Sequence, residues 1–305
     1  MSNRIARYFK DKRFRFAINN SLGLYKRMPD DQFVKLMFRS RMGYELSLDN
    51  PKTFNEKLQW LKIYDRNPEY TIMADKVRAK DYVSGILGES LIIPTLGVWE
   101  TAESIDFSSL PKQFVLKCNH NSGYGMTICT DKEKLDIEKT VSEARRGLEQ
   151  DYYIYGREWA YKDIPRRVFA EKYMIDENEG ELRDYKFFCF GGKCKFFKID
   201  FDRFIEHHAN YFDMNKKLIT LGEVICPPVP EKVLRIPDTI DKMAEYAEIL
   251  AKNHPFLRVD FYDVNGHIYF GEMTFYPSSG CGPFTEEKWD RILGDMLPLP
   301  DKAGK

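Results

Sequence analysis

The stretch 256–274 holds the acidic and basic residues whose spacing most suggests chemistry. Apolar and β-branched residues alternate with polar ones on both sides of Asn265–Gly266, a pair that tolerates positive φ, so the pattern predicts a β-hairpin. Asp260 and Glu272 then lie on facing strands, with Arg258 beside them. Two carboxylates and a guanidinium in an otherwise apolar hairpin are costly unless a cation or an anionic ligand compensates them. The alternative is a half-exposed hairpin with these charges on its solvent face.

A second candidate is a glycine-rich turn between two short predicted strands. The first strand ends in Lys117, and the turn contains Ser122, Gly123 and Gly125. Backbone N–H groups of such a turn can converge on phosphate oxygens, with the lysine as a point charge beside them. Because glycine-containing hairpin loops are common, this turn indicates a phosphate site only in combination with other features.

Two lysines one helical turn apart form a third feature. Residues 73–83 have a helical pattern, so Lys76 and Lys80 are predicted to share one face of a helix. Most such pairs are only solvated charges, which is the alternative here.

An Asp-x-Asp motif follows a hairpin that is predicted over 182–199 around Gly191–Gly192. Asp200 and Asp202 could hold the diphosphate of a nucleotide sugar through a metal ion, as in a metal-dependent glycosyltransferase. A three-residue match occurs often by chance, and a solvated strand end explains it more simply.

The N-terminal stretch 4–28 is predicted to be helical and is strongly basic. Residues 1–28 contain eight Lys or Arg against the single acid Asp11, although the whole chain has 47 basic and 47 acidic residues. Such a helix could rest on an anionic membrane surface, pack on the body of the protein, or contact an acidic partner.

Further helices and strands must position these groups. We expect helices over 29–66, where Thr53 and Glu56 form a capping box, and over 238–253. A short strand pair is expected over 92–99.

A helical region rich in aromatic residues follows over 132–165, and a strand is predicted over 167–174. The tyrosines of the helical region suit either packing or a sugar-stacking surface, and packing is the simpler explanation.

Composition excludes several classes of protein. A chain of 305 residues with balanced charge gives no argument for a nucleic-acid binder. No apolar run reaches a membrane span and no signal peptide is evident, so we expect a cytoplasmic protein. The six cysteines lie far apart, which argues against a disulfide framework or structural zinc. No motif for a nucleophilic Ser or Cys is present.

The order of three features resembles one known family. The lysine-ended strand with its glycine-rich loop, the Glu-Lys-Tyr-Met strand end at 171–174 and the hairpin with Arg258, Asp260 and Glu272 follow one another as in ATP-grasp ligases. The resemblance is strongest to the teichuronopeptide-type, or TupA-like, ATP-grasp proteins of bacterial capsule and surface-polysaccharide gene clusters, and it covers about 73–294.

This resemblance implies an α+β fold in which a nucleotide is held between two α+β lobes. The implied segments are an N-terminal helical extension (1–70), a segment preceding the ATP-grasp lobes (71–113), a lobe with the glycine-rich loop (114–170) and a C-terminal lobe with the metal-binding hairpin (171–305).

The resemblance also implies ATP-binding residues. Lys76 and Lys117 match the lysines that such enzymes direct at ATP phosphates, and Lys186 adds charge near them. Asp184 matches the carboxylate that holds the ribose hydroxyls. The loop that closes over the phosphates corresponds to Ser122, Gly123 and Gly125. The hinge that binds adenine corresponds to Glu171, Lys172, Tyr173 and Met174.

The implied metal is Mg²⁺, which prefers hard oxygen ligands. Asp260 and Glu272 match the metal-binding carboxylates, and Thr274 stands where many members have Asn, a better metal ligand than a hydroxyl. Arg258 and Lys117 match the catalytic residues that steady the transferred phosphate.

The implied activity is an ATP-dependent carboxylate–amine ligase that forms an amide through an acylphosphate. Its expected partners are a carboxylated sugar or polysaccharide precursor and an amino acid or amine. A sugar kinase on the same fold, a glycosyltransferase and an ATP-binding module without turnover remain alternatives. The candidate acceptor residues are Arg203, His207, His208, Tyr276, Ser278 and Ser279.

Overall fold

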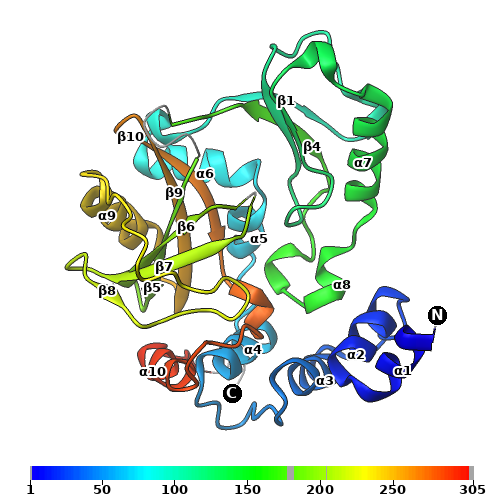
Figure 1. The fold of residues 1–305 in the computed structure, drawn as a ribbon, viewed down its shortest axis with the longest axis vertical. Helices are drawn as coiled ribbons and strands as arrows, with labels where there is room; N and C mark the ends of the chain where they lie inside the picture. Colours follow the sequence, from blue (N-terminus) through cyan, green and yellow to red (C-terminus); the bar gives the residue numbers. More distant parts are fainter. Residues whose placement is uncertain (1, 177–181, 204, 302–305) are drawn as a thin grey trace.

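The computed structural model describes residues 2–176, 182–203 and 205–301. Two antiparallel β-sheets lie at the centre of two lobes, each with helices packed against it (Figure 1). The helices are α1 (Ser2–Lys10), α2 (Lys12–Ser21), α3 (Asp30–Met42), α4 (Phe54–Tyr64), α5 (Glu69–Ala74), α6 (Arg78–Leu87), α7 (Ile137–Glu149), α8 (Tyr152–Gly156), α9 (Ile240–Ala251) and α10 (Lys288–Met296). This mixture of helix and sheet confirms the predicted α+β class.

The smaller sheet has the order β1-β4-β2-β3. Its strands are β1 (Thr95–Trp99), β2 (Phe114–Cys118), β3 (Thr127–Cys129) and β4 (Val168–Lys172). Helix α7 covers one face and shares a small apolar core with β2 and β4. Because β1 pairs with β4, the segment 71–113 contributes an edge strand to this lobe.

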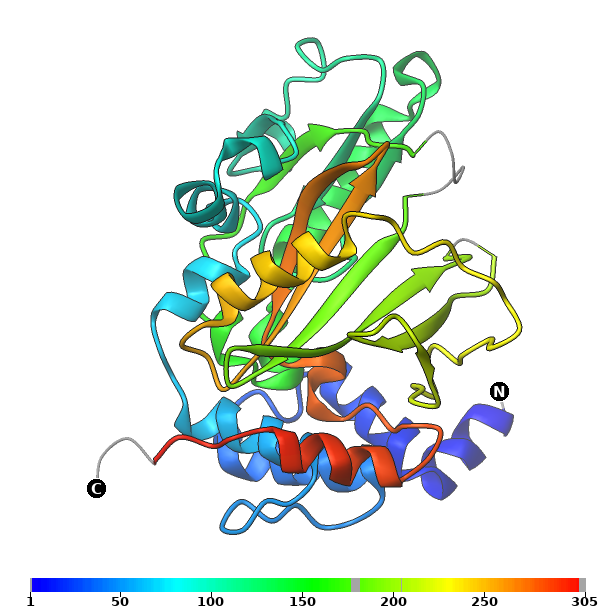
Figure 2. The ribbon, with the colours of Figure 1, turned by 90° about the vertical axis from the view of Figure 1, so that its left-hand side faces the viewer.

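The larger sheet has the order β10-β9-β5-β6-β7-β8. Its strands are β5 (Asp184–Phe190), β6 (Lys193–Phe201), β7 (His208–Asp213), β8 (Leu218–Ile219), β9 (Phe256–Val264) and β10 (His267–Thr274). Helix α9 lies across its outer face, where Phe187, Phe197 and Phe261 are fully buried (Figure 2). Burial of large aromatic side chains contributes strongly to the stability of a core, so this face stabilises the sheet. The opposite face of the same sheet carries polar side chains.

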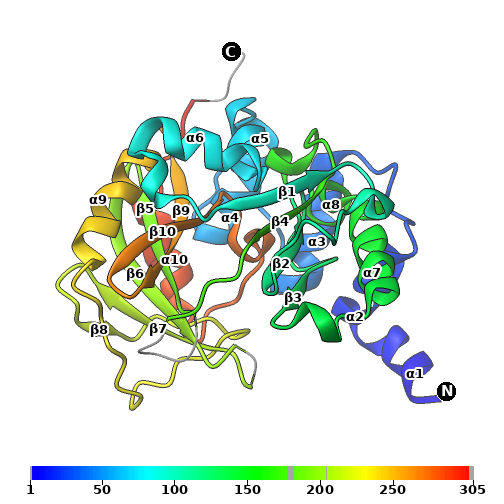
Figure 3. The same ribbon diagram turned by 90° about the horizontal axis from the view of Figure 1, so that it is seen from above.

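The N-terminal helices sit below the smaller lobe, and α4 packs against α10 beneath the larger sheet (Figure 1). Seen from above, the two sheets lie side by side, and α5 and α6 run along one edge of the molecule, in contact with β10 (Figure 3). The predicted capping box is confirmed: the Thr53 side chain accepts from the Glu56 amide, and the Glu56 carboxylate accepts from the Thr53 amide.

Three predicted elements are corrected by the structure. The single helix over 73–83 is wrong, because the chain breaks between α5 and α6 at Asp75, whose side chain accepts hydrogen bonds from Val77 and Asn119. Residues 92–99 give one strand instead of a pair, since β1 finds its partner in β4. The basic N-terminal helix is divided in two at Asp11, which caps α2.

Both predicted hairpins are confirmed. Strands β5 and β6 join at Gly191–Gly192, and β9 and β10 join at Asn265–Gly266; all four of these residues have positive φ. Residues 177–181, between β4 and β5, lie outside the described residues. None of the helices described by the structure is long and apolar enough to cross a bilayer.

Candidate active site

Asp260 and Glu272 stand directly opposite each other on β9 and β10. The pairing shifts at Gly271, and this bulge brings Glu272 instead of Gly271 opposite Asp260, so both carboxylates are on the same face of the hairpin. Asp260 is 1% exposed, whereas the Glu272 side chain is 35% exposed. The alternative of a solvent-facing charged hairpin is therefore wrong for Asp260.

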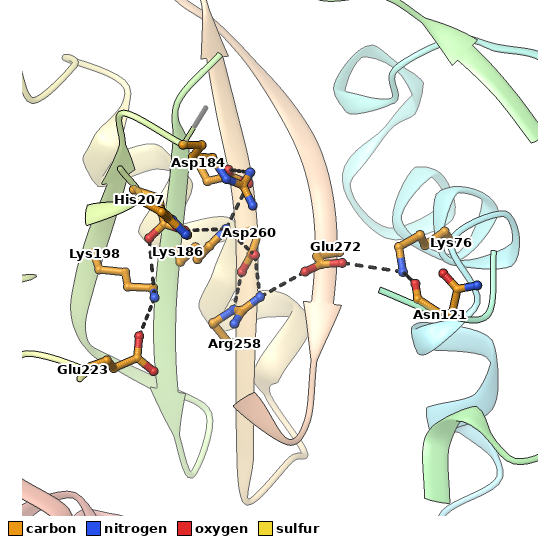
Figure 4. Close-up of polar contacts among 12 residues, drawn as sticks. Lys76, Asn121, Asp184, Lys186, Lys198, His207, Glu223, Arg258, Asp260 and Glu272 are labelled. Atoms are coloured by element: carbon orange, nitrogen blue, oxygen red, sulfur yellow. Dashed lines mark hydrogen bonds and ion pairs between the residues drawn. The ribbon is translucent and has the colours of Figure 1, made fainter. Parts of the chain in front are cut away.

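Arg258 holds the two carboxylates together (Figure 4). Its Nε and Nη2 donate to the two oxygens of Asp260, both at 2.7 Å, and Nη2 also donates to Glu272 Oε1 at 3.0 Å. Burial alone would lower the pKa of Arg258, but the facing carboxylates outweigh it and raise the pKa.

A row of charged side chains crosses four strands of the larger sheet. Lys198 on β6 pairs in register with Lys186 on β5, Lys186 with Asp260 on β9, and Asp260 with Glu272 on β10. Since side chains of residues paired in register point to one face, the row forms a continuous polar strip (Figure 4).

Lys186 is enclosed by carboxylates. Its Nζ lies 2.9 Å from Asp184, 3.0 Å from Asp260 and 3.5 Å from Asp200. Burial opposes its charge, but these carboxylates raise the pKa of Lys186 overall. The ammonium is therefore charged, as a contact to a phosphate requires.

Asp184 and Asp200 also have partners on the β6 side of the strip. Arg203 pairs with Asp184, His207 lies 3.3 Å from Asp200, and Lys198 lies 3.4 Å from Asp200.

The strip is electrically balanced. Lys198 donates to Glu223 at 2.7 Å, which completes a set of five cations and five carboxylates. The cations are Lys76, Lys186, Lys198, Arg203 and Arg258, and the carboxylates are Asp184, Asp200, Glu223, Asp260 and Glu272.

Lys76 joins this strip to the glycine-rich loop of the smaller lobe. It lies in the break between α5 and α6, and its Nζ donates to the Asn121 carbonyl at 2.7 Å and lies 3.7 Å from Glu272 Oε2 (Figure 4). The break also turns Lys76 away from Lys80, so the predicted shared helix face is wrong.

The glycine-rich loop begins beside Lys76. The Lys76 amide donates to the Asn119 carbonyl, and Gly123 and Gly125 both have positive φ. A Cβ at Gly125 would lie 3.0 Å from Cys118 Sγ and from the Gly147 Cα, so the loop packs closely on α7.

His120 in this loop is a structural residue, because its Nε2 meets the Gln150 carbonyl at 3.0 Å and the side chain is buried.

Lys117 and Lys80 meet on Glu171 at the end of the smaller sheet. Lys80 lies 3.0 Å from one oxygen of Glu171, and Lys117 contacts the other. Burial alone would raise the pKa of Glu171, but the two lysines lower it overall. Both oxygens of the Glu171 carboxylate are thus paired with lysines.

The predicted hinge residues lie where the chain leaves one sheet for the other. Strand β4 ends at Lys172, Tyr173 and Met174 follow half-buried, and β5 begins at Asp184.

A cleft of about 400 Å³ opens beside Glu272 and Thr274. Ser122 of the glycine-rich loop and Arg258 also line it, so it is continuous with the charged strip. Of the predicted acceptor residues, Tyr276, Ser278 and Ser279 line this cleft. Arg203, His207 and His208 lie elsewhere: the first two contact Asp184 and Asp200, and the third contacts the Pro227 carbonyl.

Glu158 and Lys62 form the wall of the cleft behind Ser279. Lys62 is fully buried and its Nζ donates to the Gly156 carbonyl at 2.8 Å and the Ser279 carbonyl at 2.7 Å. Burial lowers the pKa of Lys62 to about 8 and raises the pKa of Glu158, which lines the cleft.

Several site residues were missed by reasoning from the sequence. They are Arg13, Arg41, Lys62, Glu158, Lys198 and Glu223. Lys198 could have been predicted, because it lies two residues before Asp200 in the predicted hairpin, and side chains two residues apart in a strand lie on the same face. The others come from segments far apart in the chain, and no local pattern distinguishes them.

A family model described as TupA-like ATPgrasp matches residues 56–298. The chain belongs to this family. The resemblance inferred from the three motifs is thereby confirmed, and residues 1–55 precede the matched region.

Solved structures similar to the chain come from other ATP-grasp enzymes. D-alanine–D-alanine ligase of Bacillus anthracis shares 18% identity at a TM-score of 0.43, with 74% of this chain and 66% of that one covered. Biotin carboxylase of Campylobacter jejuni shares 16% sequence identity at a TM-score of 0.42, and the match covers 81% of this chain and 49% of that one. The D-alanine–D-alanine ligase of Helicobacter pylori shares 14% sequence identity at a TM-score of 0.41, and the match covers 80% of this chain and 69% of that one.

The chain thus spans between about half and two thirds of the length of these enzymes. No curated protein matches the sequence.

The donor atoms at Asp260 and Glu272 fit Mg²⁺. Both are hard carboxylate oxygens on one face, and Glu272 is open to the cleft. Asp200, His207 and Cys226 also bring ligand atoms within 4.8 Å of one another. Asp200 is paired with Lys186 and Lys198, as Asp260 is paired with Lys186 and Arg258, but none of Asp200, His207 and Cys226 lines the cleft that Glu272 opens on, so we assign no metal to this group.

Proposed function

We propose that the protein is an ATP-dependent carboxylate–amine ligase that forms an amide through an acylphosphate. The single observation that supports this most is the meeting of Lys76 with Glu272, beside Asp260 and Arg258. Charged side chains meet the glycine-rich loop of the smaller lobe there, as phosphoryl transfer needs, because that reaction depends on alignment and charge neutralisation more than on covalent chemistry.

In this proposal the lysines and the loop bind the triphosphate. Lys76, Lys117 and Lys186 direct their ammonium groups to phosphate oxygens, and Lys117 leaves Glu171 when nucleotide enters. Ser122, Gly123 and Gly125 present backbone N–H groups over the phosphates. The hinge backbone of Lys172, Tyr173 and Met174 binds adenine beside Glu171, and Asp184 binds the ribose hydroxyls.

Asp260 and Glu272, with Thr274 as a weaker ligand, would hold Mg²⁺, which neutralises charge that develops on the transferred phosphoryl group. Arg258 then turns from these carboxylates to the phosphoryl oxygens. Its position in the cleft wall next to Thr274 supports this role.

The reaction needs two substrate steps. An oxygen of the substrate carboxylate attacks the γ-phosphorus and ADP leaves, giving an acylphosphate. The nitrogen of the amine then attacks the acyl carbon, the bond to phosphate breaks, and inorganic phosphate leaves with the amide formed. We propose that Glu158 accepts the proton of the amine, because it is a carboxylate with a raised pKa in the cleft wall.

We propose a uronic-acid sugar of a surface polysaccharide, or its precursor, as the carboxylate substrate and an amino acid or amine as the nucleophile. The family supports a carboxylate and an amine. The tyrosines that line the cleft, Tyr152, Tyr155 and Tyr161, support a sugar, because aromatic faces pack on the apolar faces of sugar rings.

We place this reaction in the cytoplasm, with a peripheral membrane contact through residues 1–28 as a further proposal. Ile5 and Phe9 on α1 are 61% and 70% exposed, which supports such a contact.

The test is ADP release with product analysis. Purified protein is incubated with ATP, Mg²⁺ and pairs of uronic acids and amino acids, and products are identified by mass spectrometry. We expect ADP, phosphate and an amide in equal amounts. A stable phosphate ester would show a kinase instead, and product formation without nucleotide would reject the proposal.

A glycosyltransferase has little support. Asp200 pairs with Lys186 and Lys198, whereas Asp202 pairs with Lys232, so the two carboxylates of the Asp-x-Asp motif serve different partners. The explanation as a solvated strand end is also wrong for Asp200, which is buried.

A further inference from the structure

Two arginines in the cleft have no carboxylate partner within the part of the chain that the structure describes. Arg41 on α3 and Arg13 on α2 line the same cleft as Glu272 and Thr274. Neither forms an ion pair with a described residue, although Arg41 is near enough to Glu158 to act on the pKa of that carboxyl, which burial raises and Arg41 lowers, whereas Arg258 is paired with Asp260 and Glu272. An unpaired guanidinium beside a reaction centre is suited to a planar anion such as a carboxylate.

A second groove adjoins the cleft at these arginines. This groove, of about 610 Å³, runs between the α1–α2 junction and the end of α3, and it shares Arg13 and Arg41 with the cleft. We call it the basic groove. Its charged residues are Lys10, Asp11, Lys12, Arg13, Arg39, Arg41 and Glu45.

The charge of the basic groove is mostly unpaired. Arg39 is paired with Glu45 at 3.0 Å, and Asp11 is paired with Arg7 outside the groove at 3.3 Å. The other four basic groups have no carboxylate within reach among the residues that can be described. A row of such cations leading away from a reaction centre fits an extended polyanion better than a single small acid.

The N-terminal helices are fixed against the cleft wall, so the groove is part of the folded protein. Phe16 of α2 is buried and stacks on Tyr25. Asn20 donates to the Tyr155 carbonyl at 3.2 Å, and Arg157 donates to the Tyr25 carbonyl at 2.9 Å. Tyr155 itself lines the cleft, so α2 is tied directly to the site.

The tyrosines of the cleft favour a sugar chain over a peptide. Tyr152 and Tyr161 pack edge to face with ring centroids 4.8 Å apart, and Tyr155 is 36% exposed. Rigid, partly exposed aromatic rings between cationic groups provide both stacking for pyranose rings and attraction for their carboxylates.

We propose that α1, α2 and α3 form the acceptor half of the site and bind an acidic oligosaccharide that extends from the cleft into the basic groove. Arg41 binds the carboxylate next to the reacting sugar, and Arg13 and Lys12 bind those of the following units. This rests on the proposed function and adds to it that the acceptor is a chain rather than a single sugar.

The test is calorimetric binding of uronic acids of defined length, without nucleotide. Galacturonic acid and its octamer are the acidic probes, and maltooctaose is the neutral control. We expect the octamer to bind at least about tenfold more tightly than the monomer, and to lose affinity as salt is raised. Equal affinity of monomer and octamer, or equal binding of maltooctaose, would overturn the proposal.

Variants locate the binding. Arg13→Ala combined with Lys12→Ala should weaken octamer binding about tenfold and leave the monomer unchanged, and Arg41→Ala should weaken both. Arg27→Ala is the matched control, because Arg27 is exposed in the same segment but lines neither cavity. Equal losses in the control would show a nonspecific charge effect and reject the groove.

Two further outcomes separate the proposals. Tighter binding of poly-glutamate than of the octamer would replace the sugar by an acidic peptide and overturn the proposed ligand. Because no nucleotide is present, failure here leaves the ligase proposal standing, whereas normal octamer binding without any ADP release would reject the ligase proposal alone.

Discussion

Lys76 and Glu272 meet beside the glycine-rich loop, with 3.7 Å between Nζ and Oε2. Lys76 lies in a helix break beside the glycine-rich loop, and Glu272 lies at a bulge in the larger sheet. Each thus comes from an irregular position that sets the direction of its side chain. In the proposed enzyme, the triphosphate and Mg²⁺ would enter between them and give each a partner of opposite charge.

Replacing Lys76 should therefore weaken nucleotide binding. We expect Lys76→Met to raise the Kd for ATP about tenfold or more, because one charge-assisted contact to phosphate is lost. Titration calorimetry in the presence of Mg²⁺ measures this. Lys35→Met, at an exposed position of α3, should bind ATP as the unaltered protein does; unchanged affinity in Lys76→Met would remove Lys76 from the site.

The two carboxylates should differ in their effects on folding. Asp260→Asn leaves Arg258 and Lys186 buried without their shared partner, and we expect the free energy of unfolding to fall by roughly 3 kcal/mol. Glu272→Gln should cost far less, since Glu272 is open to the cleft. Urea unfolding measures both.

Glu272→Gln should at the same time abolish Mg²⁺-dependent turnover. A folded Glu272→Gln variant with full activity would contradict the metal assignment.

The buried Lys62 should make stability depend on pH. Burial lowers its pKa to about 8, so between about pH 8 and the ordinary lysine value of 10.5 the unfolded chain binds more protons than the folded one. Stability from this group therefore rises with pH across that window, by roughly 3 kcal/mol in total. Comparing unfolding free energies with Lys62→Met at each pH isolates this effect. A difference that stays flat from pH 8 to 10.5 would show that Lys62 is not shifted.

The glycine-rich loop offers a matched pair of substitutions. Gly123 and Gly125 both have positive φ, but only at Gly125 would a Cβ meet neighbours, at 3.0 Å. Gly123→Ala should cost about 1 kcal/mol from backbone strain alone, and Gly125→Ala roughly 1 to 3 kcal/mol more from displacement of the loop off α7. Chemical denaturation measures the two variants, and equal losses would contradict the close packing.

The hairpins could be predicted because their turns are specified locally. Asn265–Gly266 and Gly191–Gly192 supply the positive φ that two-residue turns need, and alternation fixes which residues face the site. That is why the position of Asp260 and Glu272 on facing strands could be predicted from the sequence.

Other parts of the site depend on contacts distant in the chain. The break at Lys76 could not be predicted, because Asp75 is held by Asn119, a residue of the loop more than 40 positions further on. For the same reason the sequence predicts Lys80 on the same helix face as Lys76, whereas in the structure Lys80 forms an ion pair with Glu171. Arg13 and Arg41 enter the cleft only because α2 and α3 pack beside α8, which no local pattern shows.

Nucleotide binding with and without Mg²⁺ tests the central claim most directly. The account predicts that ATP raises the melting temperature only weakly alone and strongly with Mg²⁺, and that Glu272→Gln loses the Mg²⁺-dependent part while keeping its own unliganded melting temperature. If ATP with Mg²⁺ produces no shift in the unaltered protein, or the same shift in Glu272→Gln, the charges that meet at Lys76 and Glu272 do not form a nucleotide site.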